Sequence, residues 1–159
     1  RIEAVRHEAP SDNIEMVSLC REIIGERPRD VEVHFNTNAE QAFVTGDSAQ
    51  LAQVVRNLVD NAEKYGGSER GTTVQLEASE RGWLTLSITD HGEGIAPEHL
   101  PRLTERFYRV DDSRNSATGG TGLGLAIVKH VAVAHGAQLQ IESRLGEGST
   151  FALVFSKGG

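Results

Sequence analysis

Amide and cationic side chains recur at helical spacing in the segment QVVRNLVDNAEKYG. Gln53, Asn57, Asn61 and Lys64 are four, four and three residues apart, so they share one face of a predicted helix. Asparagine is a poor helix former, so two on one face indicate either a solvated face or a ligand site. An amide oxygen suits Mg²⁺, which takes few protein ligands together with water and substrate phosphates. Lys64 and the hydroxyl of Tyr65 could reach such phosphates.

The segment DHGEGI, residues 90–95, places a carboxylate at the end of a predicted strand. Asp90 could accept a hydrogen bond from an exocyclic amine, and Gly92 and Gly94 would let the backbone approach a flat ring. The alternative is an ordinary turn in which the Asp90 side chain bonds nearby backbone. Taken alone, the segment fits the turn better.

A third segment, GGTGLGLAIVKH at residues 119–130, joins a glycine cluster to a predicted helix. It lacks the G-x-x-x-x-G-K-[ST] pattern of a P-loop. Gly120, Gly122 and Gly124 are spaced G-x-G-x-G, which is not the dinucleotide fingerprint, and no strand precedes them. What remains is a loop that ends at a helix N-terminus, where free N–H groups and the helix dipole favour an anion.

Hydrophobic periodicity predicts the elements that position these segments. A first helix is expected to begin at Asp12 or Asn13, and residues 31–37 and 42–47 are expected to pair as a hairpin. The strongest helix begins at Asp47 or Ser48. The remaining elements are strands at 71–80 and 83–90, a short helix at 97–103, a helix after Gly122, and an antiparallel pair at 137–144 and 149–156.

This order predicts one two-layer α/β (α+β) domain with a mixed, largely antiparallel sheet. About three helices would cover one face of the sheet, and the strand alternation indicates that the other face is wet. Residues 1–12 are polar and broken by Pro10, so we expect a tail or linker at 1–12 and the folded domain at 13–159.

Composition narrows the classes of function. The 159 residues are 38% hydrophobic and 25% charged, which is typical of a globular domain. A net charge of -7 argues against a broad nucleic-acid surface. The single cysteine, Cys20, excludes an internal disulfide and is expected to be buried. No segment approaches the roughly 20 apolar residues of a membrane helix. Because the chain starts at Arg1, we expect a cytoplasmic fragment of a longer protein.

Together these segments resemble the ATP-binding catalytic domain of bacterial sensor histidine kinases. That GHKL (Bergerat) fold is shared with type II topoisomerases and Hsp90-type ATPases. NLVDNAEKY is similar to the family's N box, DHGEGI to its first glycine box, and ERFYRV to its F box. GGTGLGLAIVK is similar to its second glycine box and GEGSTF to the motif that closes the site. The wording from PEHLPRL to GLGLAIVKH is most similar to phosphate-regulon sensor kinases.

The resemblance implies a site for ATP and Mg²⁺. Asn61 would bind Mg²⁺ with Asn57 beside the phosphates, and Lys64 and Tyr65 would contact the phosphate chain or the ribose. Asp90 would accept from the adenine amino group. The other implied ATP contacts are Gly92, Gly94, Ile95 and Thr150 around the base, Arg109 near the γ-phosphate, and Thr121, Gly122, Leu123 and Gly124 at the inner phosphates.

The resemblance also implies that the nucleophile lies elsewhere. His7, in RHEAP, lacks the sequence that follows the family's phosphoaccepting histidine, so the acceptor is expected on a separate dimerisation domain. A response regulator would be the next partner, the fragment itself would be a monomer, and the parent would be anchored in the inner membrane. Asn57 stands where related ATPases carry a glutamate, and an amide cannot serve as a base. The alternatives are a GHKL-type ATPase and a nucleotide-dependent interaction module.

Overall fold

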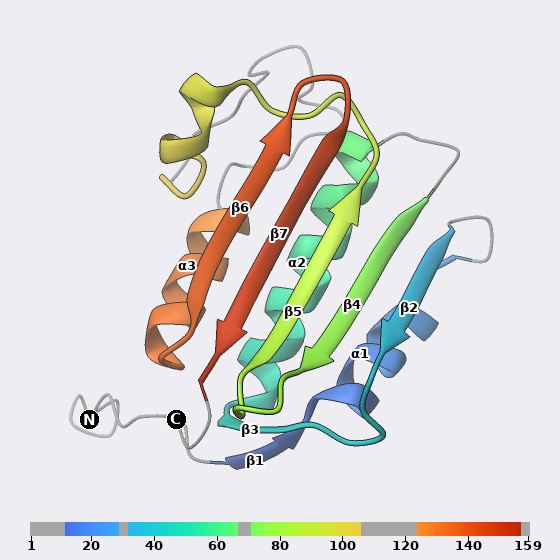
Figure 1. Cartoon of the computed structure of the whole chain (residues 1–159), viewed down its shortest axis with the longest axis vertical. Coiled ribbons are helices and arrows are strands. Elements are labelled where there is room, and N and C mark those ends of the chain that lie inside the picture. Colours follow the sequence, from blue (N-terminus) through green and yellow to red (C-terminus); the bar gives the residue numbers. More distant parts are fainter. Residues whose placement is uncertain (1–11, 29–31, 67–70, 106–123, 157–159) are drawn as a thin grey trace, which may run out of the picture.

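A five-stranded sheet with helices on one face forms the body of the chain in the computed structural model, which describes residues 12–28, 32–66, 71–105 and 124–156 (Figure 1). The strand order is β2-β4-β5-β7-β6, and only the β2–β4 pair is parallel. A separate two-stranded sheet pairs β1 with β3. The strands are β1 (Asp12–Glu15), β2 (Val33–Thr37), β3 (Phe43–Gly46), β4 (Thr72–Ala78), β5 (Leu84–Asp90), β6 (Gln138–Arg144) and β7 (Gly148–Phe155).

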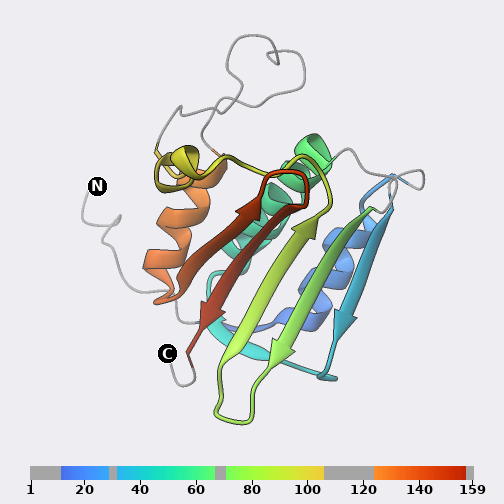
Figure 2. The ribbon, with the colours of Figure 1, turned by 45° about the horizontal axis from the view of Figure 1, so that its top comes forward.

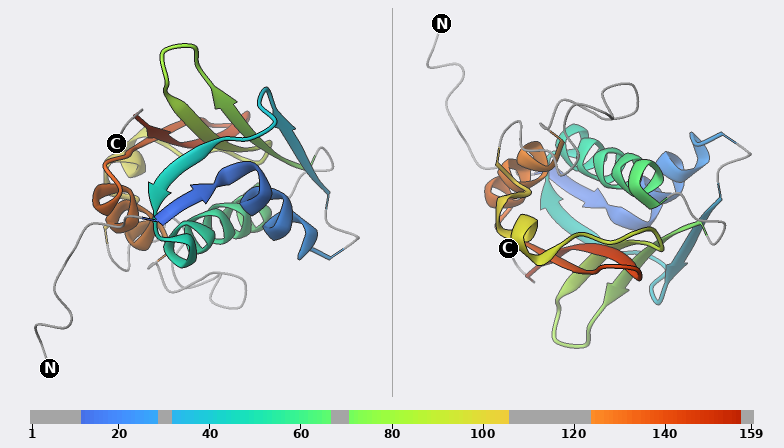
Figure 3. Two further views of the ribbon diagram at one scale, coloured as in Figure 1. Left: turned by 90° about the horizontal axis from the view of Figure 1, so that it is seen from below. Right: turned by 90° about the horizontal axis from the view of Figure 1, so that it is seen from above.

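Three α-helices lie on the same face of this sheet, and the predicted fold class is therefore confirmed (Figures 2 and 3). They are α1 (Met16–Gly25), α2 (Ser48–Gly66) and α3 (Gly124–Ala134). Views along the sheet show α2 between α1 and α3 (Figure 3). The predicted short helix is the 3₁₀ helix η2 (Pro97–Arg102), which begins at a proline. In the described ranges, no helix has the length and hydropathy needed to cross a membrane.

The central helix α2 is held by a continuous apolar stripe. Its buried side chains recur every three or four residues, which keeps them on one side of the helix. They meet the inward side chains of β4, β5 and β7, and the alternate side chains of those strands, such as Gln75 and Ser87, face away from the helices. The most fully buried members are Leu51, Val54, Val55, Leu58 and Val59 from α2, with Val74, Leu76, Leu86, Ile88 and Leu153 from the sheet.

The predicted hairpin of residues 31–37 with 42–47 is wrong. β2 pairs in parallel with β4, and β3 pairs with β1. Alternating hydrophobicity predicts a strand but does not identify its neighbour. Asn38 directly follows β2, and its side chain makes two hydrogen bonds to the backbone of Ala78. Asn38 Oδ1 accepts from the Ala78 N–H at 2.8 Å, and Asn38 Nδ2 donates to the Ala78 carbonyl at 2.9 Å. These bonds tie the end of β2 to β4 instead of to β3.

The N-terminus of α2 is capped as predicted. The Gln50 N–H donates to Asp47 Oδ1 at 2.9 Å. His135, just after α3, reaches the same place: its Nε2 accepts from the Asp47 N–H at 3.0 Å, and its Nδ1 lies 2.8 Å from the Val131 carbonyl. These two partners require a neutral ring with its proton on Nδ1. His135 therefore links the start of α2 to the end of α3.

The predicted cap of α1 at Asp12 or Asn13 is wrong, because both residues lie in β1 and the helix begins after Glu15. The Glu15 carboxylate accepts from the N–H groups of Val17 and Ser18, both at 2.9 Å, and from the Ala42 N–H at 2.8 Å. Partial burial alone would raise its pKa, but these bonds and the Ser18 hydroxyl together lower the pKa of Glu15 to about 2. One carboxylate thus joins α1 to the segment before β3.

We expect Glu15 to stabilise the fold in a pH-dependent way. Its folded pKa of about 2 lies below the ordinary value of 4.5, so its contribution is complete above about pH 4.5 and is lost as the pH falls toward 2. Glu15→Ala should lower the free energy of unfolding at pH 7 by about 1–2 kcal/mol, after allowing for solvent screening. Urea denaturation between pH 7 and pH 3 should show a flatter acid loss in the variant. Parallel pH profiles would contradict the prediction.

Candidate functional site

Most of the described candidate residues gather at one end of the sheet. There β5 ends at Asp90, β7 begins at Gly148, and the C-terminal end of α2 lies behind them, with α3 beside α2 (Figures 1 and 2). The connection after β5 and the turn between β6 and β7 form the rim of this end. Antiparallel pairing of β5 with β7 is what brings these distant sequence motifs together.

Asp90 is a buried carboxylate on the helix-covered side of the sheet, with only 4% of its surface exposed. Burial raises its pKa above the ordinary value, while hydrogen bonds from the backbone of Gly92 and Ser149 and the nearby His91 act in the opposite direction. The Gly92 N–H donates to Oδ1 at 3.0 Å, so the turn chemistry expected for this segment is present. The same carboxylate remains available to accept from a ligand, because each of its oxygens has more than one lone pair.

The glycine loop after Asp90 lies against the β6–β7 turn. Gly94 has a φ of +80°, and a Cβ built on it would lie 2.0 Å from the carbonyl oxygen of Arg144. A Cβ on Gly148 would similarly lie 2.1 Å from the carbonyl oxygen of Asp90. Glycine at these positions therefore permits backbone-to-backbone packing. The sequence suggested that glycine is needed at position 94 for the backbone to approach a flat ring. In the structure, the close neighbour of Gly94 is the backbone of Arg144.

The amide face of α2 is directed toward the start of α3. Asn57 and Asn61 are half-buried and Lys64 is exposed, and Asn57 Nδ2 donates to the Gly124 carbonyl at a long 3.4 Å. The Asn57 amide thus lies beside the start of α3, where a helix N-terminus favours an anion, and Asn61 follows one turn later on the same face of α2. The predicted stripe extends to Gln53, which is exposed. The backbone of Tyr65 belongs to α2, and its side chain lies outside the described residues.

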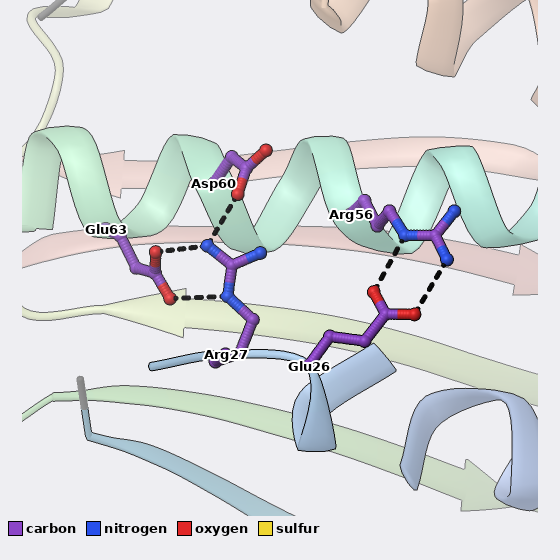
Figure 4. A network of polar contacts seen from close by, with 5 residues as sticks. All are labelled: Glu26, Arg27, Arg56, Asp60 and Glu63. Atoms are coloured by element: carbon purple, nitrogen blue, oxygen red, sulfur yellow. Dashed lines mark hydrogen bonds and ion pairs between the residues drawn. The ribbon is translucent and has the colours of Figure 1, made fainter. Parts of the chain in front are cut away.

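An ion-pair network fixes α2 from its other side (Figure 4). Arg27, just after α1, has a side chain only 17% exposed; its Nη2 lies 2.6 Å from Asp60 Oδ1, and its Nε donates to Glu63 Oε2 at 3.1 Å. Arg56 of α2 makes two bonds of 3.0 Å to Glu26. Asp60 and Glu63 lie close to Asn61 in the sequence. Both carboxylates are bonded to Arg27, on the side of α2 that faces α1.

The structure separates Thr150 from Asp90. Thr150 Oγ1 lies 2.9 Å from Thr89 Oγ1, on the sheet face that points away from the helices. Ser149 is the neighbour of Asp90 across the β5–β7 pair and is 5% exposed. The Thr150 side chain therefore faces away from the Asp90 carboxylate, and Ser149 is the residue of β7 on the Asp90 side; the expected contact of Thr150 with the base stays a prediction. Phe151, Leu153 and Phe155 are buried at every second position of β7. Extending this alternation back along the strand predicts that Ser149, and not Thr150, faces the same side as Asp90.

Other predicted contacts lie outside the described residues, namely Arg109, Thr121, Gly122 and Leu123. Among the residues that are described, no group of three or more His, Cys, Asp or Glu side chains could hold a metal by itself. The amide oxygens of Asn57 and Asn61 do fit Mg²⁺ in its common protein setting, where one or two protein ligands are completed by water and phosphate oxygens. The donor set fits a metal that arrives with a phosphate ligand.

Comparisons with known proteins agree with this geometry. The family model described as "Histidine kinase-, DNA gyrase B-, and HSP90-like ATPase" matches residues 46–158. The phosphate regulon sensor protein PhoR of Pseudomonas aeruginosa is 55% identical over 111 residues, which are 70% of this chain and 25% of that protein. The sensor-like histidine kinase SenX3 of Mycobacterium tuberculosis is 42% identical over 144 residues, 90% of this chain and 34% of that protein. The chain thus spans about a quarter to a third of these relatives.

Solved structures show the same fold. A mycobacterial sensor histidine kinase, MprB, matches with a TM-score of 0.76 and 30% identity, over 91% of this chain and 97% of that chain. The histidine kinase domain of the E. coli osmosensor EnvZ matches with a TM-score of 0.72 and 25% identity, over 96% and 92%.

The two arginines of Figure 4 should differ in their effect on stability. Arg27→Ala leaves two carboxylates of α2 without their cation, and we expect a loss of about 1–2 kcal/mol in the free energy of unfolding. Arg56→Ala removes a pair that is almost half exposed on both sides, so its loss should be much smaller. Urea denaturation of both variants at one salt concentration measures the difference. Equal losses would show that Arg27 does not fix α2 more firmly than Arg56 does.

Proposed function

This chain belongs to the family of histidine kinase-, DNA gyrase B- and HSP90-like ATPases, and from that membership we propose that it is the catalytic domain of a two-component sensor histidine kinase. It is homologous to the ATPase catalytic domains of such kinases. The domain binds ATP with Mg²⁺ and delivers the γ-phosphoryl group to a histidine on a separate dimerisation domain. From there the group passes to a response regulator. The domain acts in the cytoplasm as part of a longer, membrane-anchored sensor.

The buried carboxylate of Asp90, at the end of β5, is the observation that carries this proposal. Asp90 is 4% exposed, and no ion pair with another described residue balances its charge, so its burial is costly unless the carboxylate recognises a ligand. The exocyclic amine of adenine provides a donor that guanine lacks at the same ring position. Asp90 therefore selects the base, and the Gly92 and Ser149 backbone groups orient the carboxylate for this task.

The phosphates would extend from the base toward α2 and the start of α3. Asn61 and Asn57 would offer amide oxygens to the metal and its water shell, and Lys64 would offer a positive charge. When bound, Mg²⁺ neutralises phosphate charge and orients the γ-phosphoryl group. The N-terminal N–H groups of α3 would accept an inner phosphate. Tyr65, Arg109, Thr121, Gly122 and Leu123 stay in the proposed ATP site on the strength of the sequence motifs alone.

Phosphoryl transfer to a histidine is favoured over hydrolysis by the side chains of α2. Asn57 has no basic group, and the carboxylates of Asp60 and Glu63 are both bonded to Arg27. An activated water would need a base that this face of α2 does not offer. The alternatives, a GHKL-type ATPase and a nucleotide-dependent interaction module, become outcomes of the transfer experiment below.

Asp90→Asn should weaken ATP binding by about 10- to 100-fold, because the variant loses the charged acceptor. The fold without nucleotide should be unchanged or slightly more stable, because burial raises the pKa of Asp90 and its charge opposes folding. Titration calorimetry and thermal denaturation measure the two effects. Asp47→Asn, the same change at the cap of α2, is the control and should bind ATP normally. Unchanged ATP affinity in Asp90→Asn would refute the assignment of the base site.

The transfer reaction itself tests the proposed function. The chain is incubated with Mg²⁺ and γ-labelled ATP, alone and with a separate dimerisation domain that carries the phosphoaccepting histidine. We expect acid-labile label on the added domain, and none when its histidine is replaced by glutamine. Release of free phosphate without label would identify an ATPase, and binding without either product would identify an interaction module. Acid-labile label on this chain alone would contradict the absence of an internal acceptor.

A further inference from the structure

The loop that follows Asp90 is fastened to the turn between β6 and β7. The Gly146 N–H donates to the Glu93 carbonyl at 2.6 Å, and the Ile95 N–H donates to the hydroxyl oxygen of Ser143 at 2.7 Å. The close approach of Gly94 to Arg144 lies between these two bonds. The shape of the loop at the proposed base site therefore depends on residues of the β6–β7 turn.

Ser143 uses its whole hydrogen-bonding capacity in this contact. Its Oγ accepts from Ile95 and donates to the Gly148 carbonyl at 3.0 Å. Because a hydroxyl has one proton, the third contact, 2.8 Å to Ser149 Oγ, requires Ser149 to be the donor. The Ser143 hydroxyl thus joins β6 to two other pieces of chain, the loop at Ile95 and the first two residues of β7.

The third contact leads back to Asp90. Ser149 pairs with Ser143 on one side and with Asp90 on the other, in the β6–β7 and β5–β7 ladders. The Ser149 backbone also hydrogen-bonds the Asp90 carboxylate. One path of bonds therefore runs from Ile95 through Ser143 and Ser149 to Asp90, and it encloses the loop that bears Gly92 and Gly94.

We propose that Ser143 is a positioning residue that sets base selectivity in the nucleotide site. It contacts no nucleotide in this proposal; it holds the 91–95 loop and the Ser149 end of β7 so that Asp90 meets the adenine amine. This inference rests on the proposed ATP-binding function. Loss of the hydroxyl leaves the Ile95 N–H and the Gly148 carbonyl without their partner, so the loop relaxes away from Asp90.

The test compares the affinities of four proteins for ATP and GTP by titration calorimetry. The proteins are the unmodified chain, Ser143→Ala, Ser143→Thr and Ser87→Ala. Ser143→Ala should bind ATP about tenfold more weakly. Its preference for ATP over GTP should fall by a similar factor, because only ATP uses the Asp90 acceptor. Ser143→Thr retains the hydroxyl and should restore both values to within about twofold.

Ser87→Ala is the matched control, because Ser87 lies in the middle of β5 on the sheet face away from the site. It should leave both affinities unchanged. A general loss of stability would weaken ATP and GTP equally and leave their ratio intact, so the ratio reports positioning. Hydrogen exchange at the Ile95 amide should also be faster in Ser143→Ala than in the unmodified chain.

If Ser143→Ala does not fold, Ser143→Cys decides the question, because a thiol keeps the size of the side chain but is a much weaker donor and acceptor. It should lower the preference for ATP about threefold. An unchanged ATP-to-GTP ratio in whichever of these variants folds would overturn the role of Ser143. Failure of the unmodified chain to bind ATP would overturn the proposed function instead, and the two failures are therefore distinguishable.

Discussion

The burial of one side of α2 against β4, β5 and β7 is the contact on which the rest of the structure depends. A helix turns by about 100° per residue, so fixing its apolar stripe also fixes where its other side chains lie. In α2 the amide of Asn57 is directed toward α3, and the partners of Arg27 are directed toward α1. One helix thus presents three separate faces, to the core, to the proposed ATP site and to the neighbouring helix α1.

The buried carboxylate at the end of β5 destabilises the fold, and the packing of the core must offset this loss of stability. Asp90 continues the row of inward side chains that begins with Leu84, Leu86 and Ile88, yet it is a carboxylate. Its burial raises its pKa, and backbone groups of Gly92 and Ser149 only partly compensate. An apolar residue would suit this position better for stability alone, so the charge is best explained by recognition. Strand geometry, which fixes the direction of every second side chain, is what holds it in place.

The sequence was informative where the pattern itself is the physical cause, and uninformative where a distant partner decides. The periodicity of α2 and the alternation of β4, β5 and β7 predict their own burial, because the same spacing produces the buried face. The prediction of a hairpin between β2 and β3 is wrong because β2 pairs with β4, a strand far along the chain. The predicted cap residue of α1 is wrong because Glu15 caps the helix, and its carboxylate also accepts from the distant Ala42 N–H. The inward direction of Ser149 could have been predicted, because it lies two residues before the inward-facing Phe151 in β7.

Charge explains how a chain with a net charge of -7 can hold a polyphosphate. Asp60 and Glu63 flank Asn61 and would repel such a ligand if their charges were unopposed. Both are bonded to Arg27, and the next cation along α2, Arg56, is balanced by Glu26. Within residues 12–28, 32–66, 71–105 and 124–156, no carboxylate forms an ion pair with Lys64, so its positive charge adds to that of the α3 N-terminus. The ion pairs that fasten α1 to α2 therefore also neutralise the carboxylates nearest the amide face. This explains why an overall acidic domain needs no broad basic surface at this site: the neutralisation is local and is built from the same contacts that orient the helix.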